Sequence, residues 1–76
     1  MNKMKSKLYY QVLDAFDIAT NFYKKQVRTL IGCAIHEDNV KLRHQCLQDA
    51  EQYREWQREL ELARIDFINE YEPEEE

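Results

Sequence analysis

The chain has 76 residues, a formal net charge of −4, one glycine, one proline and nine aromatic residues. A β-rich domain of this size needs turn residues every ~8–12 positions, so the shortage of Gly and Pro argues against it. With 43% hydrophobic residues, the chain is also too apolar for a disordered segment. We therefore predict an all-α fold in a single helical domain, residues 1–76.

The first predicted helix covers about residues 7–34. In a helical projection its apolar side chains occupy about half of the circumference, a wider arc than one neighbouring helix covers. This arc consists of Leu8, Val12, Ala15, Phe16, Ala19, Phe22, Tyr23, Val27 and Leu30. We expect the Ser6 hydroxyl to cap the first turn. Gly32 is the alternative end of this helix, because glycine disfavours a helix interior.

A turn is predicted at residues 35–38, with Asp38 or Asn39 as the cap of the next helix. The second helix is expected over about 39–71, since no Gly or Pro interrupts it. Pro73 and an acidic tail, residues 72–76, follow its end.

The second helix carries a seven-residue repeat that indicates a coiled-coil seam. One position of the repeat is occupied by Cys46, Tyr53, Leu60 and Phe67. The companion position is assigned to Leu42, Asp49, Trp56, Ala63 and Glu70. The sequence thus predicts a long antiparallel helical hairpin in which facing residue numbers add up to about 75. The expected facing pairs are Leu30–Cys46, Tyr23–Tyr53, Ala19–Trp56, Phe16–Leu60, Val12–Ala63, Gln26–Asp49, and Leu8 or Tyr9 with Phe67. In this register Trp56 is buried against Ala19.

Both cysteines and both histidines lie between residues 33 and 46, which raises the question of a metal site. Cys33 and His36 share a helix face, but His44 and Cys46 are two residues apart and point in opposite directions. We therefore expect no metal, no cofactor and no Cys33–Cys46 disulfide. Cys46 is assigned to the seam, Cys33 to the core near the turn, and His44 to solvent.

Apolar residues remain outside the predicted seam, and they indicate a further partner. On the second helix these are Val40, Leu47, Leu62, Ile65 and Ile68. A second copy would cover such residues by pairing two hairpins into a four-helix bundle, so a homodimer is expected.

The two cysteines and the length of the longest apolar run indicate where in the cell the protein is located. Two cysteines without a disulfide-framework spacing favour reduced thiols and a cytoplasmic location, the host cytoplasm if a phage encodes the protein. The longest apolar run, residues 30–35, is far shorter than the ~20 residues of a membrane span, and no secretory leader is expected.

No catalytic motif stands out, so we expect a small protein–protein interaction module rather than an enzyme. Its size and charge density would suit a phage- or plasmid-encoded factor that inhibits or redirects a host protein. The polar side of the first helix combines mixed charge with an exposed aromatic side chain, which is typical of protein-binding surfaces. The predicted partner-binding residues are Tyr10, Asp14, Asp17, Lys24, Lys25 and Arg28.

Two alternative functions involve nucleic acid. Lys24, Lys25, Arg28, Lys41 and Arg43 gather towards the turn and could contact RNA or DNA phosphates. The acidic C-terminus could instead imitate DNA in an inhibitor.

Overall fold

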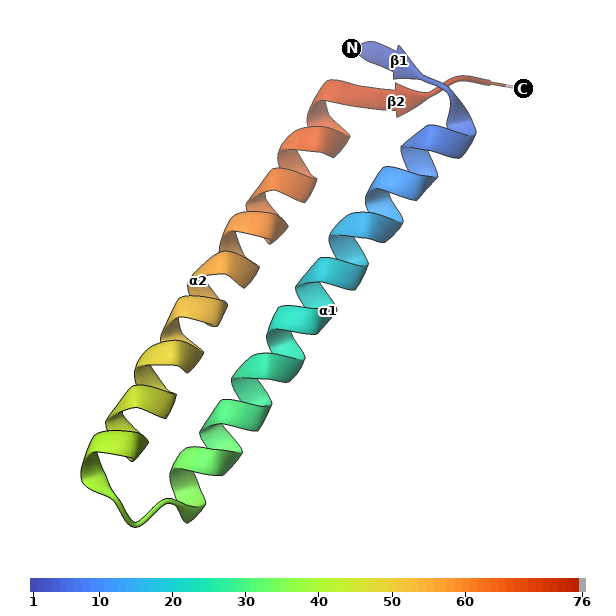
Figure 1. Cartoon of the computed structure of the whole chain (residues 1–76). Coiled ribbons are helices and arrows are strands. Elements are labelled where there is room, and N and C mark those ends of the chain that lie inside the picture. Colours follow the sequence, from blue (N-terminus) through green and yellow to red (C-terminus); the bar gives the residue numbers. More distant parts are fainter. Residues whose placement is uncertain (76) are drawn as a thin grey trace.

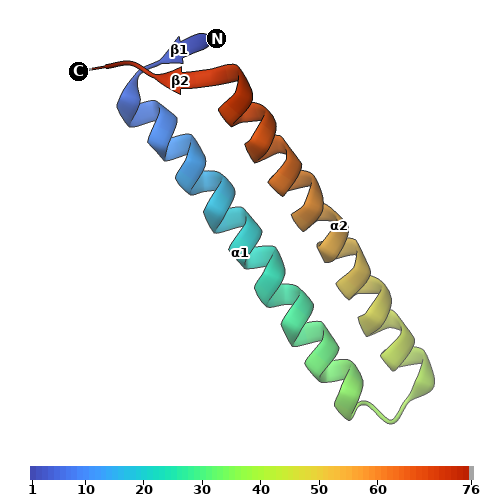
Figure 2. The ribbon, with the colours of Figure 1, turned by 180° about the vertical axis from the view of Figure 1, so that it is seen from behind.

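The computed structural model describes residues 1–75 and shows a helical hairpin, which confirms the predicted all-α class. Helix α1 (Ser6–His36) and helix α2 (Val40–Glu70) run antiparallel and lie side by side along their whole length (Figures 1 and 2). The Cα atoms extend over 57 × 16 × 10 Å, so the hairpin is one helix thick. Each helix therefore has one side against its neighbour and the rest of its circumference facing outwards.

The connection between the helices is short and is held by side chains. The Asn39 side-chain oxygen accepts hydrogen bonds from the backbone N–H groups of Lys41 (3.0 Å) and Leu42 (3.2 Å), which confirms Asn39 as the cap of α2. The Arg43 guanidinium donates to the Glu37 carbonyl at 2.8 and 3.1 Å. Helix α1 continues through Gly32 and ends two residues beyond the predicted position, so the loop is residues 37–39.

At the opposite end, the two chain ends form a small parallel sheet that the sequence did not predict. Strands β1 (Asn2–Met4) and β2 (Tyr71–Pro73) pair with Lys3 opposite Glu72, and the Glu74 N–H donates to the Met4 carbonyl at 2.8 Å (Figure 1). The first part of the predicted acidic tail is therefore strand, while Glu76 lies outside the described residues. A three-residue strand is too short to show an alternating pattern, which explains why it was missed.

The predicted cap at Ser6 is wrong. Ser6 is the first residue of α1, and its hydroxyl donates a hydrogen bond to the Glu74 carbonyl instead of accepting one from the first turn. Lys5 occupies the cap position without a side-chain hydrogen bond. The sheet supplies a partner for this hydroxyl that local sequence does not reveal.

The seam between the helices follows the 4–3 spacing of a coiled coil on both sides. On α1 it consists of Tyr9, Leu13, Phe16, Thr20, Tyr23, Val27, Leu30 and Ala34, all buried or half-buried. On α2 it consists of Cys46, Ala50, Tyr53, Gln57, Leu60, Arg64 and Phe67, also buried or half-buried. The predicted positions Cys46, Tyr53, Leu60 and Phe67 are thus confirmed.

The companion positions on α2 were predicted one residue too early. The structure buries Ala50 and half-buries Gln57 and Arg64, whereas Leu42, Asp49, Trp56, Ala63 and Glu70 are exposed. Trp56 keeps 41% of its surface exposed, so its predicted burial against Ala19 is wrong within a single hairpin. Ala50, at 4% exposure, lets the helices approach closely. The Arg64 head instead reaches Asp17 on α1, with 3.1 Å between Nε and Oδ1.

The predicted register between the helices nevertheless holds at its aromatic pairs. Ring centroids of Tyr23 and Tyr53 are 5.8 Å apart, and those of Tyr9 and Phe67 are 5.3 Å apart. Phe67 also contacts Phe16 at 6.1 Å and stacks on Tyr71 at 5.1 Å. The rings of Tyr9, Phe16, Phe67 and Tyr71 form an aromatic cluster beneath the strands. This cluster ties the chain ends to the hairpin.

Candidate protein-binding face

Helix α1 carries a second apolar series with the same coiled-coil spacing as the seam. Its members each precede a seam residue by one position, so the series is rotated by about 100° around the helix. They are Leu8, Val12, Ala15, Ala19, Phe22, Gln26, Thr29 and Cys33, with spacings that alternate between four and three residues. Six of the eight are apolar, and within the hairpin these six are exposed or only half-buried. Leu8 is 49% exposed and Phe22 is 52% exposed.

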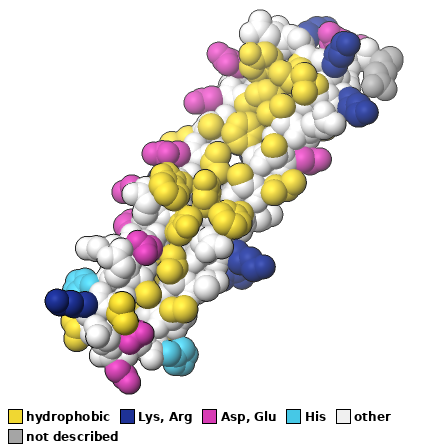
Figure 3. All heavy atoms as spheres, in the orientation of Figure 1, with side chains coloured by type: hydrophobic (Ala, Val, Ile, Leu, Met, Phe, Trp, Pro, Cys, Tyr) yellow, Lys and Arg dark blue, Asp and Glu magenta, His cyan; other side chains and the backbone are white. Residues whose placement is uncertain are grey.

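Helix α2 completes this side of the hairpin with Trp56 and Ala63. Shallow hollows follow one another along it: Val12 and Ala15 line one with Leu60, Trp56 and Ala63 line another, and Gln26 and Asp49 share a third. We name this side, formed by the second series of α1 together with Trp56 and Ala63, the open face. Figure 3 shows it as a band of hydrophobic side chains along the hairpin, with acidic side chains on its α2 edge.

The hairpin alone buries little apolar surface. Among the described residues, the hydrophobic side chains that count as buried are Tyr9, Val27, Ala34 and Ala50, and no large side chain is fully enclosed. The accessible surface is 6019 Å². A compact monomer of 9.3 kDa is expected to expose about 5,000 Å², so the hairpin exposes about 1,000 Å² more. The elongated shape of the hairpin thus leaves much of its surface, including apolar side chains of the open face, exposed to solvent.

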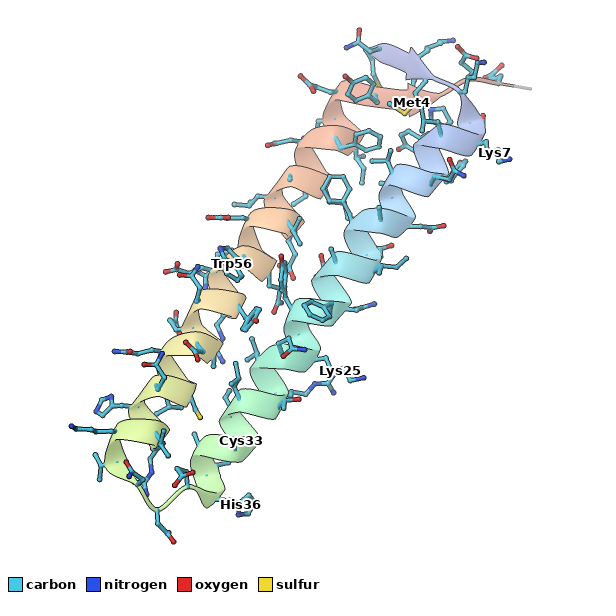
Figure 4. The ribbon with its side chains drawn as sticks, in the orientation of Figure 1. Met4, Lys7, Lys25, Cys33, His36 and Trp56 are labelled. Atoms are coloured by element: carbon cyan, nitrogen blue, oxygen red, sulfur yellow. The ribbon has the colours of Figure 1, made fainter. Side chains whose placement is uncertain are left out.

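The six partner-binding residues predicted from the sequence all lie on exposed positions of α1, away from the open face. They do not form one uniform surface: Asp17 pairs with Arg64 of α2, and Tyr10 packs its ring edge-on against Tyr9 at 5.2 Å. Lys25 projects from the side of α1 that faces away from α2, as does Lys7 (Figure 4). The sequence indicated that the apolar arc of α1 is wider than one helix covers, but it did not indicate which part of the arc faces α2, so the open face was not separated from the seam. The signal was present in the second 4–3 series.

The cysteines and histidines do not converge. Cys46 is half-buried in the seam and His44 is exposed, as predicted, whereas Cys33 is exposed and not part of the core. Cys33 and His36 lie on α1 near the turn (Figure 4). Within residues 1–75, no group of three His, Cys, Asp or Glu side chains is placed to hold a metal ion. Both thiols are free.

The basic residues near the turn are partly engaged within the chain, because Arg43 holds the Glu37 carbonyl. Glu37 and Asp38 add negative charge at the same end. Across the described part of the chain, neither helix is apolar enough over sufficient length to cross a membrane.

Comparison of the chain with models of known protein families, with curated proteins and with solved structures gives no match. The function is therefore inferred from the geometry of the hairpin.

Proposed function

We propose that the chain is a protein–protein interaction module that binds its partner through the open face. The observation that carries this proposal is the second series of α1, which follows coiled-coil spacing, is mostly apolar and is left exposed or half-buried by the hairpin. Helices that present such a series bury it against a partner helix, because apolar area removed from water contributes ~25 cal/mol per Å².

A binding role accounts for the open face better than catalysis or phosphate recognition does. Its hollows are shallow and open, so they would not exclude water from a reacting group. Phosphate recognition would need a uniformly basic surface, but the basic turn end also contains Glu37 and Asp38, and Arg43 is engaged with the turn. The acidic C-terminal segment is joined to β1, where Glu72 lies opposite Lys3. We place the activity in a cytoplasm, where free thiols such as Cys33 and Cys46 persist.

The proposal is tested by capturing partners from a lysate of the native host with three forms of the tagged protein. These are the wild type, Phe22→Glu on the open face, and Tyr10→Ala with Arg28→Glu on the polar side of α1. The helical content of each is checked by circular dichroism, and the lysate is treated with nuclease so that nucleic acid cannot bridge the proteins. We expect Phe22→Glu to lose at least tenfold in captured partner, while the polar-side variant retains it.

Loss of capture by the polar-side variant alone would assign binding to Tyr10 and Arg28, as the sequence suggested, and would refute the open face. Capture that occurs in a parallel lysate without nuclease, but disappears on nuclease treatment, would assign the protein to nucleic-acid binding instead.

A further inference from the structure

We propose that the partner of the open face is a second copy of this chain, with α1 of one copy antiparallel to α1 of the other. This inference rests on the proposed function, since it names what covers the open face. The result is a four-helix bundle with two-fold symmetry, in which both copies use the same surface.

The second series of α1 is self-complementary about the middle of the helix. Two antiparallel copies that cross between residues 20 and 21 place facing positions whose numbers add up to 41. The facing pairs are Leu8–Cys33, Val12–Thr29, Ala15–Gln26 and Ala19–Phe22. Ala15 and Ala19 face the larger Gln26 and Phe22, so small side chains meet large ones at the middle of the contact, as close packing requires. Because α1 spans Ser6–His36, this crossing point also gives nearly complete overlap of the two helices.

Charge favours the same antiparallel orientation. The first half of α1 carries Lys7, Asp14 and Asp17, a net charge of −1, whereas the second half carries Lys24, Lys25 and Arg28, a charge of +3. Antiparallel packing brings the acidic half of one copy beside the basic half of the other. These charged side chains lie on the polar side of α1, away from the open face, so they favour this orientation through long-range attraction and not through pairs in the contact. A parallel arrangement would place like charges beside each other.

The hairpin is large enough for the interface of a stable dimer. The Cα atoms span 57 Å by 16 Å, so the flat outline of one side of the hairpin is about 900 Å². Two such faces together give about 1,800 Å², within the range of specific interfaces.

Trp56 then lies close to the two-fold axis. Its ring centroid is 5.8 Å from that of Tyr23, which places Trp56 at the level of the crossing point between residues 20 and 21. The part of its ring that a single hairpin leaves exposed would face the second copy. The dimer would thus bury a large aromatic side chain that the single hairpin leaves 41% exposed.

The first test is the mass of the purified protein in light scattering at about 10–100 µM. We expect twice the chain mass of 9.3 kDa, about 18.6 kDa, for the wild type. Ala15→Glu should give the single-chain mass, because Ala15 is exposed in the hairpin and would be buried in the dimer. The matched control is Ile65→Glu, since Ile65 is also exposed but lies nine residues from Trp56, or 180° around α2. It should remain a dimer. Circular dichroism verifies that both variants are folded.

The second test determines which helices meet. In a Cys33→Ser, Cys46→Ala background, Val12→Cys is mixed under oxidising conditions either with Thr29→Cys or with Ala63→Cys. The antiparallel contact of α1 with α1 predicts a disulfide-linked product of about 18.6 kDa in the Thr29 mixture and none in the Ala63 mixture. The reverse result would overturn this arrangement and show that α1 packs on α2 of the other copy.

Failure of this inference is distinguishable from failure of the proposed function. A wild type that remains at 9.3 kDa at every concentration, or an Ala15→Glu variant that still dimerises, refutes the second copy on the open face. Neither outcome depends on the host lysate. Partner capture that is lost in Phe22→Glu would still support the open face as a surface for a different protein.

Discussion

Replacement of Phe67 by alanine should weaken the hairpin more than any change on the open face. Phe67 contacts Tyr9, Phe16 and Tyr71, with ring centroids 5.1–6.1 Å away, and so joins α1, α2 and β2. Truncation of a buried Phe typically costs 3–5 kcal/mol. Because Phe67 is half-buried, we expect the lower end, about 3 kcal/mol. A domain of 76 residues has a free energy of unfolding of roughly 4–11 kcal/mol, so this loss is a large share.

The matched control is Phe22→Ala, which removes the same atoms from the open face. Phe22 is 52% exposed and has Tyr23 as an aromatic neighbour at 5.7 Å, so we expect a loss of about 1 kcal/mol within a single hairpin. Both changes are made in the Ala15→Glu variant at a concentration where light scattering gives the single-chain mass.

Urea denaturation followed by circular dichroism gives the two free energies, and thermal melting gives an independent comparison. A loss of 3 kcal/mol corresponds to a decrease in Tm of about 12–24 °C for a domain of this size. If Phe22→Ala costs as much as Phe67→Ala, the aromatic cluster beneath the strands does not hold the hairpin together, and the packing described here is wrong.

Three further substitutions test local features of the hairpin. Asn39→Ala should lower the free energy of unfolding by about 1 kcal/mol in urea denaturation, because two backbone N–H groups lose their acceptor, whereas Asn39→Asp should retain most of it. Gly32→Ala should raise the free energy of unfolding by about 1 kcal/mol, because α1 is helical there and an added Cβ meets nothing within 4 Å. This gain would be seen as a Tm increase of about 4–8 °C, whereas a decrease would show strain at this position. A double-mutant cycle of Asp17→Ala and Arg64→Ala should give a coupling of about 0.2–1 kcal/mol that falls as salt is added, because this ion pair is substantially exposed; a coupling insensitive to salt would contradict that.

The architecture of the hairpin was predictable because long-range periodicity and local cap chemistry agree. The heptad at Cys46, Tyr53, Leu60 and Phe67 and the Asn39 cap depend on the chain's own spacing, and both are confirmed. The end strands were not predictable, since their pairing joins residues almost 70 positions apart and each strand is three residues long.

The main error of the sequence prediction was to place Trp56, and not Gln57, in the seam of α2. Trp56 and Gln57 are neighbours on α2, and hydropathy favoured Trp56 for the seam. In the structure the long side chains of Gln57 and Arg64 lie along the seam and reach polar partners at its edge, with Gln57 donating to Glu61 at 3.0 Å. One sequence contains two apolar flanks on α1, and periodicity alone cannot say which of them faces α2. The open face followed only once the seam was located.

The sheet at the chain ends has a consequence for the order of folding. If β1 and β2 met in an unfolded chain, they would have to close a loop of about 70 residues, which is entropically costly. If the two helices form first, starting at the Asn39 turn, they bring β1 and β2 to the same end of the hairpin. The strands then have only a short distance to cover before they pair. The strands are therefore expected to pair last and to open first, before the helices separate. The two strands at the chain ends can thus separate while the seam and the open face remain intact.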